Sequence, residues 1–272
     1  MLMNRSIKVL VIAVLGLAAL SFSSLVMGQT NFLVTIEQPG VQESNLFTNP
    51  DQFGATEVFV ESFNSQLVGF DSAGFSFAGD DQIGNYSQSN IVSADVFGGA
   101  RGADGYFTVH PGRNGSPGDA VVSIFHLDIP QRYFGFWWSA GDASNELEFY
   151  QDGVLIQRFT TADVIDFLGN ESNTDDYFGN PNAGFLGGNQ AEPYGFLNFF
   201  ANPQLETVVF DEIHFINESA SSGFESDNHT IAASFEGISG EEIISPVPEP
   251  TTWTVILLMA FLRCCCLRFR TA

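Results

Sequence analysis

Basic residues are scarce in this 272-residue chain, and most of the few present lie near its two ends. Lys8 is the only lysine. Between Glu37 and Glu249, four arginines accompany all 32 acidic residues, which gives that span a formal charge of −28. Such a surface repels nucleic acids and anionic lipids, so neither is expected as a partner. The simplest interpretation is a solvated acidic surface, and the lack of lysine suits a saline or calcium-rich exterior.

Cysteine is also missing from most of the chain. The three cysteines are adjacent, at positions 264 to 266. This excludes a fold held by disulfides, and adjacent cysteines are poorly placed to converge on one tetrahedral metal ion. An apolar core must therefore hold the fold, and 28 phenylalanines supply the area for it.

Catalytic signatures are lacking too. The chain has no HExxH, no G-x-S-x-G, no Walker A and no dinucleotide-binding fingerprint. The four histidines are scattered, at His110, His126, His214 and His229. Carboxylates are so frequent that a glycosidase-like pair can be drawn anywhere, so none counts as a signal. The sequence predicts no catalytic residue.

The N-terminus has the three regions of a secretory signal peptide. Arg5 and Lys8 are basic, Val9–Leu20 is apolar, and a stretch of small residues ends at Gly28. This order predicts recognition by the secretion machinery and cleavage between Gly28 and Gln29. An uncleaved membrane helix is the alternative, which the short apolar run disfavours.

The C-terminus combines three further features. Prolines at every second position hold Pro246–Pro250 extended, and the apolar run Trp253–Leu262 follows. Arg263, Arg268 and Arg270 close the chain. Residues 251–262 would span only about 18 Å as a helix, against roughly 30 Å of hydrocarbon, unless the helix continues to residue 267. A plain C-terminal anchor would show the same features apart from the Pro-Glu-Pro tripeptide.

Pro248, Glu249 and Pro250, with the apolar run and the arginines after them, resemble the PEP-CTERM sorting signal of bacterial surface proteins. The resemblance covers about a tenth of the chain. It implies an exosortase, a membrane-embedded cysteine protease, as a partner. It also implies transient anchoring in the inner membrane and release near the tripeptide to the cell surface or an exopolysaccharide matrix.

The middle of the chain alternates short apolar segments with clusters of Gly, Asn, Asp and Pro. This pattern predicts an all-β fold, a jelly-roll-like β-sandwich. Asp152-Gly153 predicts a tight hairpin, because Gly accepts positive φ. One short helix is expected at Thr161–Leu168, with Asp163 in its first turn and Gly169 after its end. The expected strands are Glu57–Asn64, Phe75–Ala78, Ile91–Phe97, Gly105–His110, Ala120–Asp128, Tyr133–Ser139, Glu146–Gln151, Val154–Phe159, Tyr194–Phe200, Thr207–Ile216 and Phe224–Ala232. The apolar patch Phe32–Ile36 before them is either a first edge strand or part of a loose lead-in.

About a hundred residues of this region carry a second resemblance. The aromatic segment Tyr133–Phe159, the helix after it, and the segments YGFLNFFA, TVVFDEIHF and FESDNHTIA follow an order found in many PEP-CTERM proteins. Those bodies are similar to jelly-roll sandwiches of the carbohydrate-binding-module type. The resemblance implies this fold and gives no assigned activity.

Aromatic side chains on the segment Tyr133–Ser139 are candidates for stacking on sugar rings. Phe134, Phe136 and Trp138 share one face of the expected strand, and Tyr133 and Trp137 share the other. In a Phe-rich sandwich without cysteine, aromatics on a central strand favour the core. We therefore predict that they are buried.

A group of polar residues could be interpreted as calcium ligands. Asp211 shares a strand face with apolar residues, Asp227 and Asn228 lie in the closing strand, and Asp142 and Asn145 lie in a turn. No compact loop with calcium-ligand spacing is present, so no metal ligand is assigned. A carboxylate capped by backbone N–H groups at a strand end, or turned outward by a bulge, is the preferred interpretation.

These features divide the chain into a signal peptide (1–28), a lead-in or edge strand (29–56), a β-sandwich (57–235), a linker (236–247) and a sorting and anchor segment (248–272). We expect an exported surface or extracellular-matrix protein with a structural, adhesive or exopolysaccharide-associated role. A calcium-dependent carbohydrate-binding module or a secreted glycan-active enzyme is the alternative.

Overall fold

The computed structural model describes residues 31–80, 82–102, 105–113, 115–116, 121–217, 219 and 221–243. The expected signal peptide lies outside these residues, as do its cleavage point Gly28/Gln29 and the sorting residues Pro248, Glu249, Pro250, Arg263, Arg268 and Arg270. Within the described ranges, no helix has the length and apolar character needed to cross a membrane.

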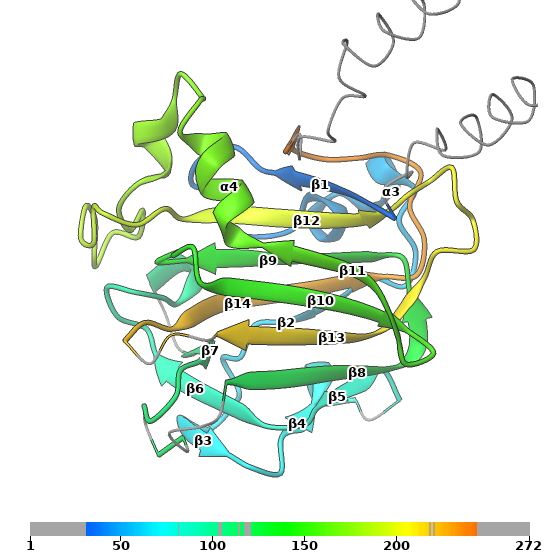
Figure 1. Cartoon of the computed structure of the whole chain (residues 1–272), viewed down its shortest axis with the longest axis horizontal. Helices are drawn as coiled ribbons and strands as arrows, with labels where there is room; N and C mark the ends of the chain where they lie inside the picture. The colour runs from blue at the N-terminus through cyan, green and yellow to red at the C-terminus, as the bar shows by residue number, and fades with distance from the viewer. Residues whose placement is uncertain are drawn as a thin grey trace, which may run out of the picture.

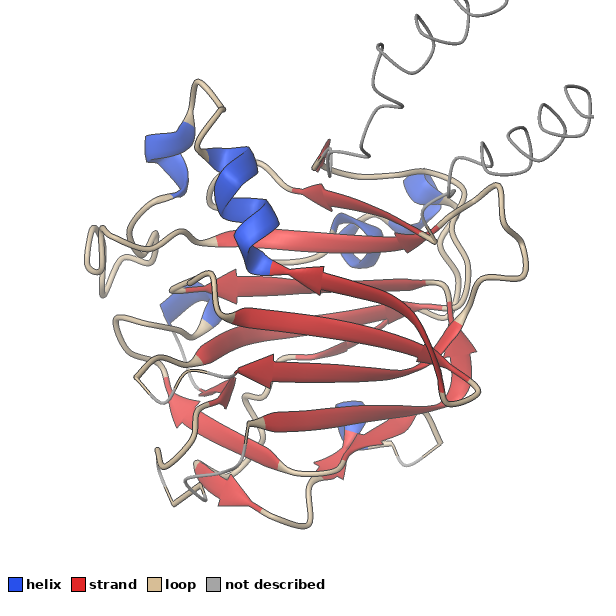
Figure 2. Ribbon diagram, viewed as in Figure 1, coloured by secondary structure: helices blue, strands red, loops and turns tan. Residues whose placement is uncertain are grey.

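Two antiparallel sheets face each other (Figure 1, Figure 2), which agrees with the all-β sandwich predicted from the sequence. In the described part of the chain, the larger sheet has the order β15-β1-β12-β9-β14-β7-β6-β3, with β2 also paired to β14, and the smaller sheet has the order β11-β10-β13-β8-β5-β4. The larger sheet contains β1 (Phe32–Ile36), β2 (Phe59–Glu61), β3 (Gly69–Asp71), β6 (Ser89–Ser93), β7 (Gly105–Val109), β9 (Tyr133–Ser139), β12 (Gly195–Ala201), β14 (Phe224–Ala232) and β15 (Glu241–Glu242). The smaller sheet contains β4 (Phe75–Ser76), β5 (Gly84–Tyr86), β8 (Val122–Gln131), β10 (Asn145–Gln151), β11 (Val154–Thr160) and β13 (Phe210–Asn217).

The chain repeatedly crosses from one sheet to the other. It passes from β8 in the smaller sheet to β9 in the larger, returns for β10 and β11, and crosses again for β12, β13 and β14. As a result, the β9–β10 and β13–β14 connections meet at one end of the sandwich, on the left of Figure 1. These connections, together with the one after β7, shape the site described below.

Aromatic rings fill the space between the sheets. Phe134, Phe136 and Trp138 of β9 point into this core, and each is fully buried. Tyr133 and Trp137 point to the opposite face of the larger sheet and are buried in two satellite clusters there. The prediction that these five aromatics are structural is therefore confirmed.

One polar side chain lies in the middle of this aromatic core. His229 of β14 is fully buried, with Tyr86 Oη 2.7 Å from its Nδ1 and Ser226 Oγ 2.8 Å from its Nε2. The ring of Phe215 stacks on the imidazole at 4.9 Å between centroids. Burial lowers the pKa of His229 well below its usual value, so the imidazole is neutral at physiological pH.

Helices are more numerous than the sequence suggested. The expected helix is present as α4 (Thr161–Leu168), but two further single-turn helices, α2 (Asn45–Thr48) and α3 (Pro50–Phe53), correct the prediction of one helix. The Ser44 hydroxyl caps α2 by accepting from the N–H of Leu46, and Pro50 begins α3. Such short helices have no apolar periodicity, so a search for periodicity misses them.

Several strand boundaries also differ from the prediction. β6 ends at Ser93 rather than Phe97, because the Asp95 side chain accepts from the N–H of Phe97 and the Asp95 N–H donates to the carbonyl of Gly98. The short strands β3 and β5 were not predicted, since two or three paired residues leave little pattern in a sequence.

The ordered sheet extends beyond both limits of the predicted sandwich. β1 pairs with β12 inside the stretch 29–56, and β15 pairs with β1 inside the stretch 236–247. Side-chain amides join these segments to each other and to the body: Asn198 Nδ2 in β12 donates to the carboxylate of Glu37 at 3.0 Å, and Asn45 Nδ2 donates to Ser239 Oγ at 2.9 Å. Both stretches contribute to the fold.

Candidate functional site

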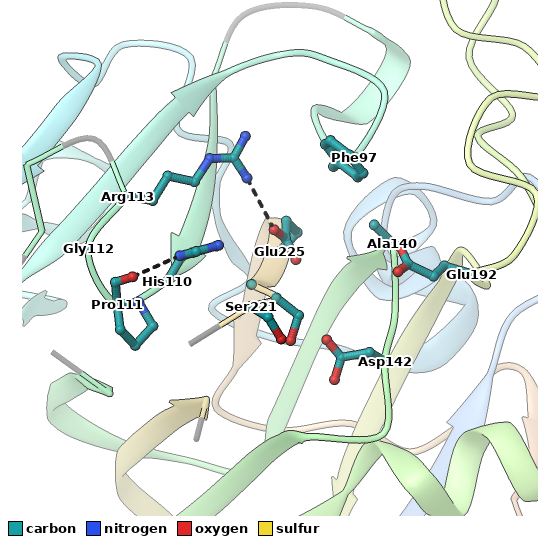
Figure 3. Close-up of a pocket in the computed structure, with 12 residues that line it drawn as sticks. Phe97, His110, Pro111, Gly112, Arg113, Ala140, Asp142, Glu192, Ser221 and Glu225 are labelled. Atoms are coloured by element: carbon teal, nitrogen blue, oxygen red, sulfur yellow. Dashed lines mark hydrogen bonds and ion pairs between the residues drawn. The ribbon is translucent and has the colours of Figure 1, made fainter. Parts of the chain in front are cut away.

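A pocket of about 580 Å³ opens at the end of the sandwich where these connections meet (Figure 3). Residues before β7, after β7, after β9 and before β14 form its wall, and the segment before β12 adds one carboxylate. Its lining residues are Phe97, His110, Pro111, Gly112, Arg113, Ala140, Asp142, Glu192, Ser221, Ser222, Gly223 and Glu225.

Two buried asparagines hold the connections around the pocket. Asn217 Nδ2 donates to the carbonyls of Val109 and Ser222, at 2.9 and 2.7 Å. Asn145 Nδ2 donates to the carbonyl of Gly223 at 3.0 Å. Both asparagines are almost fully buried, so these bonds satisfy backbone groups that water does not reach. The pocket wall is thus fixed to the ends of β10 and β13.

Glu225, which lines the pocket, belongs to a polar row on the outer face of the larger sheet. Glu225 pairs with Thr108 on one neighbouring strand and with Ser139 on the other, so the three side chains lie beside one another across β7, β14 and β9. All three residues are at most 4% exposed. The hydroxyls of Thr108 and Ser139 have no hydrogen-bond partner among the described residues. Buried hydroxyls in this state have hydrogen-bonding capacity that the described residues leave unmet.

Glu225 is the most perturbed carboxyl group in the pocket. Burial is the main cause, and it raises the pKa of Glu225 to about 8 despite the guanidinium of Arg113, whose Nη1 lies 3.6 Å from Oε1. Asp142 and Glu192 add like-charge repulsion in the same direction. Glu225 is therefore mostly protonated at neutral pH and presents an O–H donor as well as an acceptor.

Glycine at position 223 leaves room for this carboxyl group. A Cβ there would lie 2.0 Å from Oε1 of Glu225. The carboxyl group occupies the space that a side chain at position 223 would fill, which brings it to the pocket surface.

Arg113 links the opposite wall of the pocket to the Glu225 carboxyl group. Its Nη2 lies 3.2 Å from Asp95 Oδ2, and its guanidinium carbon lies 5.9 Å from the centre of the Phe97 ring. Asn90 Nδ2 donates to the carbonyl of Arg113 at 3.1 Å and fixes the loop to β6. The partly exposed Phe97 ring gives the pocket a phenyl surface.

Asp142 faces the pocket from the turn between β9 and β10 (Figure 3). Its Oδ1 accepts from the N–H of Ser144 at 2.6 Å, and its carbonyl accepts from the Thr161 hydroxyl at the start of α4 at 2.5 Å. Its Oδ2 is buried and has no hydrogen-bond partner in the described part of the chain. This oxygen is an acceptor that the fold leaves unused.

The residues considered for calcium do not form one site. Asp211 follows a bulge in β13, and its Oδ2 accepts from the N–H of Asp152 at 2.9 Å in the β10–β11 turn, at the far end of the strands from Asp142. This is the capped carboxylate of the preferred interpretation. Asp227 accepts from the N–H groups of Ala100 and Asn228, at 2.6 and 2.7 Å. Among the described residues, no group of three or more His, Cys, Asp or Glu side chains is arranged to hold a metal ion.

A second charged cluster covers the outer face of the smaller sheet. His126 Nδ1 and His214 Nε2 lie 2.8 and 2.6 Å from the two carboxylate oxygens of Glu212. Arg158 Nε lies 2.9 Å from Glu148 Oε1 on the adjacent strand. These side chains pair with one another across four strands through ion pairs and hydrogen bonds. The cluster is therefore a surface network that stabilises the sheet.

Comparison with known proteins gives no relative: no family model matches the chain, and no curated protein matches it. Any function must therefore be argued from the sequence patterns and the site.

Most of the pocket residues were not singled out by the sequence. Asp142 was noted as a turn residue and His110 as an isolated histidine, whereas Glu225, Arg113 and Glu192 carried no motif. A signal was present in β14, where six consecutive polar residues lie in one strand, Glu225 to Thr230. Every residue of β14 is buried, and buried polar groups require partners or mark a site.

Proposed function

We propose that this chain is an exported surface or matrix protein whose jelly-roll-like sandwich binds a saccharide in the pocket at the end of the two sheets. The observation that carries the proposal is a pocket of about 580 Å³ whose lining combines the Glu225 carboxyl, the Arg113 guanidinium and the Asp142 carboxylate, one oxygen of which has no partner among the described residues. A pocket of this size is within the range of about 300–1,000 Å³ found for small-molecule sites.

The chemistry of the lining suits a polyhydroxylated ligand. Sugar hydroxyls both donate and accept hydrogen bonds, and the pocket offers both functions through the Glu225 carboxyl, the Arg113 guanidinium and the unused Asp142 oxygen. The Phe97 ring supplies an apolar surface for the C–H groups of a sugar ring. A nucleotide or other phosphate ester would meet three carboxyl groups and a single guanidinium, so it is disfavoured.

The remainder of the proposal rests on the chain ends and the topology. Strands that alternate between the two sheets from β8 to β14 support a jelly-roll-like arrangement. The signal-peptide pattern and the resemblance of Pro248, Glu249 and Pro250 to a sorting signal support export, exosortase processing and delivery to an exopolysaccharide-containing surface. The resulting role is adhesive or structural, through attachment to a polysaccharide.

A glycan array tests the binding half of the proposal. The full-length protein should bind a subset of immobilised oligosaccharides, and Arg113→Gln should lose that binding. Arg132→Gln is the matched control, because Arg132 also lies over a phenylalanine ring, Phe235, but does not line the pocket. An array without any bound glycan, or equal loss in both variants, would contradict the proposal.

Replacement of Pro248, Glu249 and Pro250 by alanine tests the sorting half. The wild-type protein should lose its C-terminal segment and reach the surface, as judged by intact mass and fractionation, while the variant stays in the inner membrane. If both proteins keep the segment and share one location, the segment is an anchor without a sorting function.

A second candidate is a secreted glycan-active enzyme. The pKa of about 8 makes Glu225 a proton donor at neutral pH, and Asp142 faces the same pocket. A protonated and an ionised carboxyl group at one sugar-sized site are the components of acid-assisted glycoside hydrolysis. Release of reducing ends from a bound glycan by the wild-type protein, but not by Glu225→Gln, would favour this function over binding alone.

A further inference from the structure

The charges around the pocket are not balanced. Asp142 and Glu192 contribute two carboxylates to its lining, Glu225 is mostly protonated and adds little charge, and Arg113 contributes the one guanidinium among the described lining residues. That guanidinium is shared with Asp95 outside the pocket, at 3.2 Å. The chain as a whole has a formal charge of −23, so no distant positive field compensates. The pocket therefore attracts cations and repels anions.

The carboxyl groups differ in how far the protein satisfies them. Glu192 Oε2 accepts from Asn189 Nδ2 at 2.5 Å, and Glu225 faces Arg113. Asp142 uses Oδ1 for its own turn, while Oδ2 is buried without a partner among the described residues. An unpartnered buried carboxylate oxygen is costly for the free protein, and a ligand that donates to it recovers that cost. The ligand should therefore bring a donor to Asp142, and a charged donor would be the strongest.

A bare divalent ion does not fit this arrangement. Within the described residues, no three acidic or histidine side chains converge as metal ligands. The Glu225 carboxyl and the Arg113 guanidinium, which both line the pocket, instead suit a ligand that carries hydroxyl groups together with its positive charge.

We propose that the pocket selects a saccharide unit with a free, protonated amine, whose ammonium group lies against the Asp142 carboxylate while its hydroxyls face the Glu225 carboxyl group and the Arg113 guanidinium. This inference rests on the proposed saccharide-binding function and names the class of sugar. An N-acetylated unit of the same sugar lacks the positive charge and leaves the Asp142 oxygen without a charged donor, so it binds more weakly.

The test compares two tetramers that differ only at nitrogen. The full-length protein is titrated calorimetrically with β-1,4-linked tetramers of glucosamine and of N-acetylglucosamine at about pH 6, below the usual pKa of an amine. The glucosamine tetramer should bind at least about tenfold more tightly. A hydrogen bond to a charged group contributes more free energy than a tenfold change in affinity requires. Asp142→Asn should remove the preference. Asp51→Asn makes the same charge change on an exposed helix, α3, and should retain it.

Three results would overturn the inference. The first is equal affinity for the two tetramers, in which case saccharide binding itself stands and the amine is irrelevant. The second is that tetralysine binds as tightly as the glucosamine tetramer and that Asp142→Asn changes neither affinity, which would show general attraction to an acidic surface. The third is that neither tetramer binds. This result removes the proposed function as well only if the glycan array is also blank. If Asp142→Asn does not fold, the affinities of the wild-type protein for the two tetramers and for tetralysine decide the inference on their own.

Discussion

At the scale of single residues, the buried polar groups of β14 set much of the character of this molecule. Glu225 and His229 lie four residues apart on one strand, and burial shifts both towards neutrality: the pKa of the acid rises and that of the imidazole falls. Glu225 lines a pocket, whereas His229 is enclosed by aromatic rings. Burial therefore keeps a pocket residue neutral in one case and a core residue neutral in the other.

The first prediction concerns Glu225 and pH. Its pKa is about 8 in the folded protein against an ordinary value of 4.5, so between these pH values the folded protein holds a proton that the unfolded chain has lost. The stability contribution is complete below pH 4.5 and declines as the pH rises through 8, with a slope of at most about 1.4 kcal/mol per pH unit. Glu225→Gln removes this proton and should flatten the decline.

Denaturant unfolding of both proteins between about pH 5 and 9 measures the difference. Subtracting the two curves isolates Glu225 from other groups with raised pKa values, such as the buried Glu61. Parallel curves for wild type and variant would show that Glu225 is ionised and solvated in the folded protein.

The second prediction concerns Tyr86. Tyr86→Phe leaves His229 Nδ1 without its partner in a fully buried position and should destabilise the protein by about 1–3 kcal/mol. Tyr150→Phe is the matched control: Tyr150 donates to Glu148 on the sheet surface, and Glu148 keeps Arg158, so the expected loss is under about 1 kcal/mol. Equal losses in urea unfolding would argue against a special cost of the buried histidine.

At the scale of elements, turns and caps determine where strands begin and end. The β10–β11 turn has positive φ at both Asp152 and Gly153, +51° and +73°, as a two-residue hairpin requires. Asp211 accepts from the N–H of Asp152 and ties this turn to β13. The sequence predicted this hairpin correctly because the dipeptide Asp-Gly carries the backbone requirement itself.

The third prediction follows from that turn. Gly153→Ala places a Cβ in open space but in a left-handed backbone conformation, and should cost about 1 kcal/mol or slightly more. Gly184→Ala is the control, because position 184 also has open space and no positive φ, so its effect should be near zero. Melting temperatures of the two variants make the comparison. A similar drop in melting temperature in both variants would mean that backbone strain at position 153 does not determine the loss of stability.

Long, strongly patterned elements were predictable and the site was not. The segment Tyr133–Ser139 and the helix Thr161–Leu168 were predicted with the boundaries that the structure shows. The pocket depends instead on register: Glu225 meets Thr108 and Ser139 only through strand pairing between segments about 85 to 115 residues apart. Alternation along a strand reveals the face on which a residue lies, but it contains no information about which residues lie opposite.

At the scale of the whole molecule, the charge is the dominant property. The body has many carboxylates, no lysine and few arginines, and its outer faces hold only local ion pairs such as Arg101 with Glu43. Self-repulsion of such a surface lowers the stability of the compact state in dilute buffer.

The fourth prediction is therefore a dependence on salt. The melting temperature should rise as sodium chloride increases from about 10 mM to 0.5 M, because the Debye length falls below the spacing of surface charges. Calcium chloride at equal ionic strength should give a similar or modestly larger rise. A melting temperature independent of both salts would contradict the view that repulsion limits stability and that the chain suits a saline exterior.

The central claim is that the pocket beside Glu225 is a saccharide site, and a titration with the pocket obstructed tests it most directly. Ser221 is exposed and lines the pocket, so Ser221→Trp fills the space without touching the buried polar row. Ser65→Trp makes the same change at an exposed position that does not line this pocket. With a sugar identified on the array, calorimetry should give one site per chain for wild type and Ser65→Trp, and at least about tenfold weaker binding for Ser221→Trp. Equal affinity in all three proteins would place the sugar elsewhere and contradict the account.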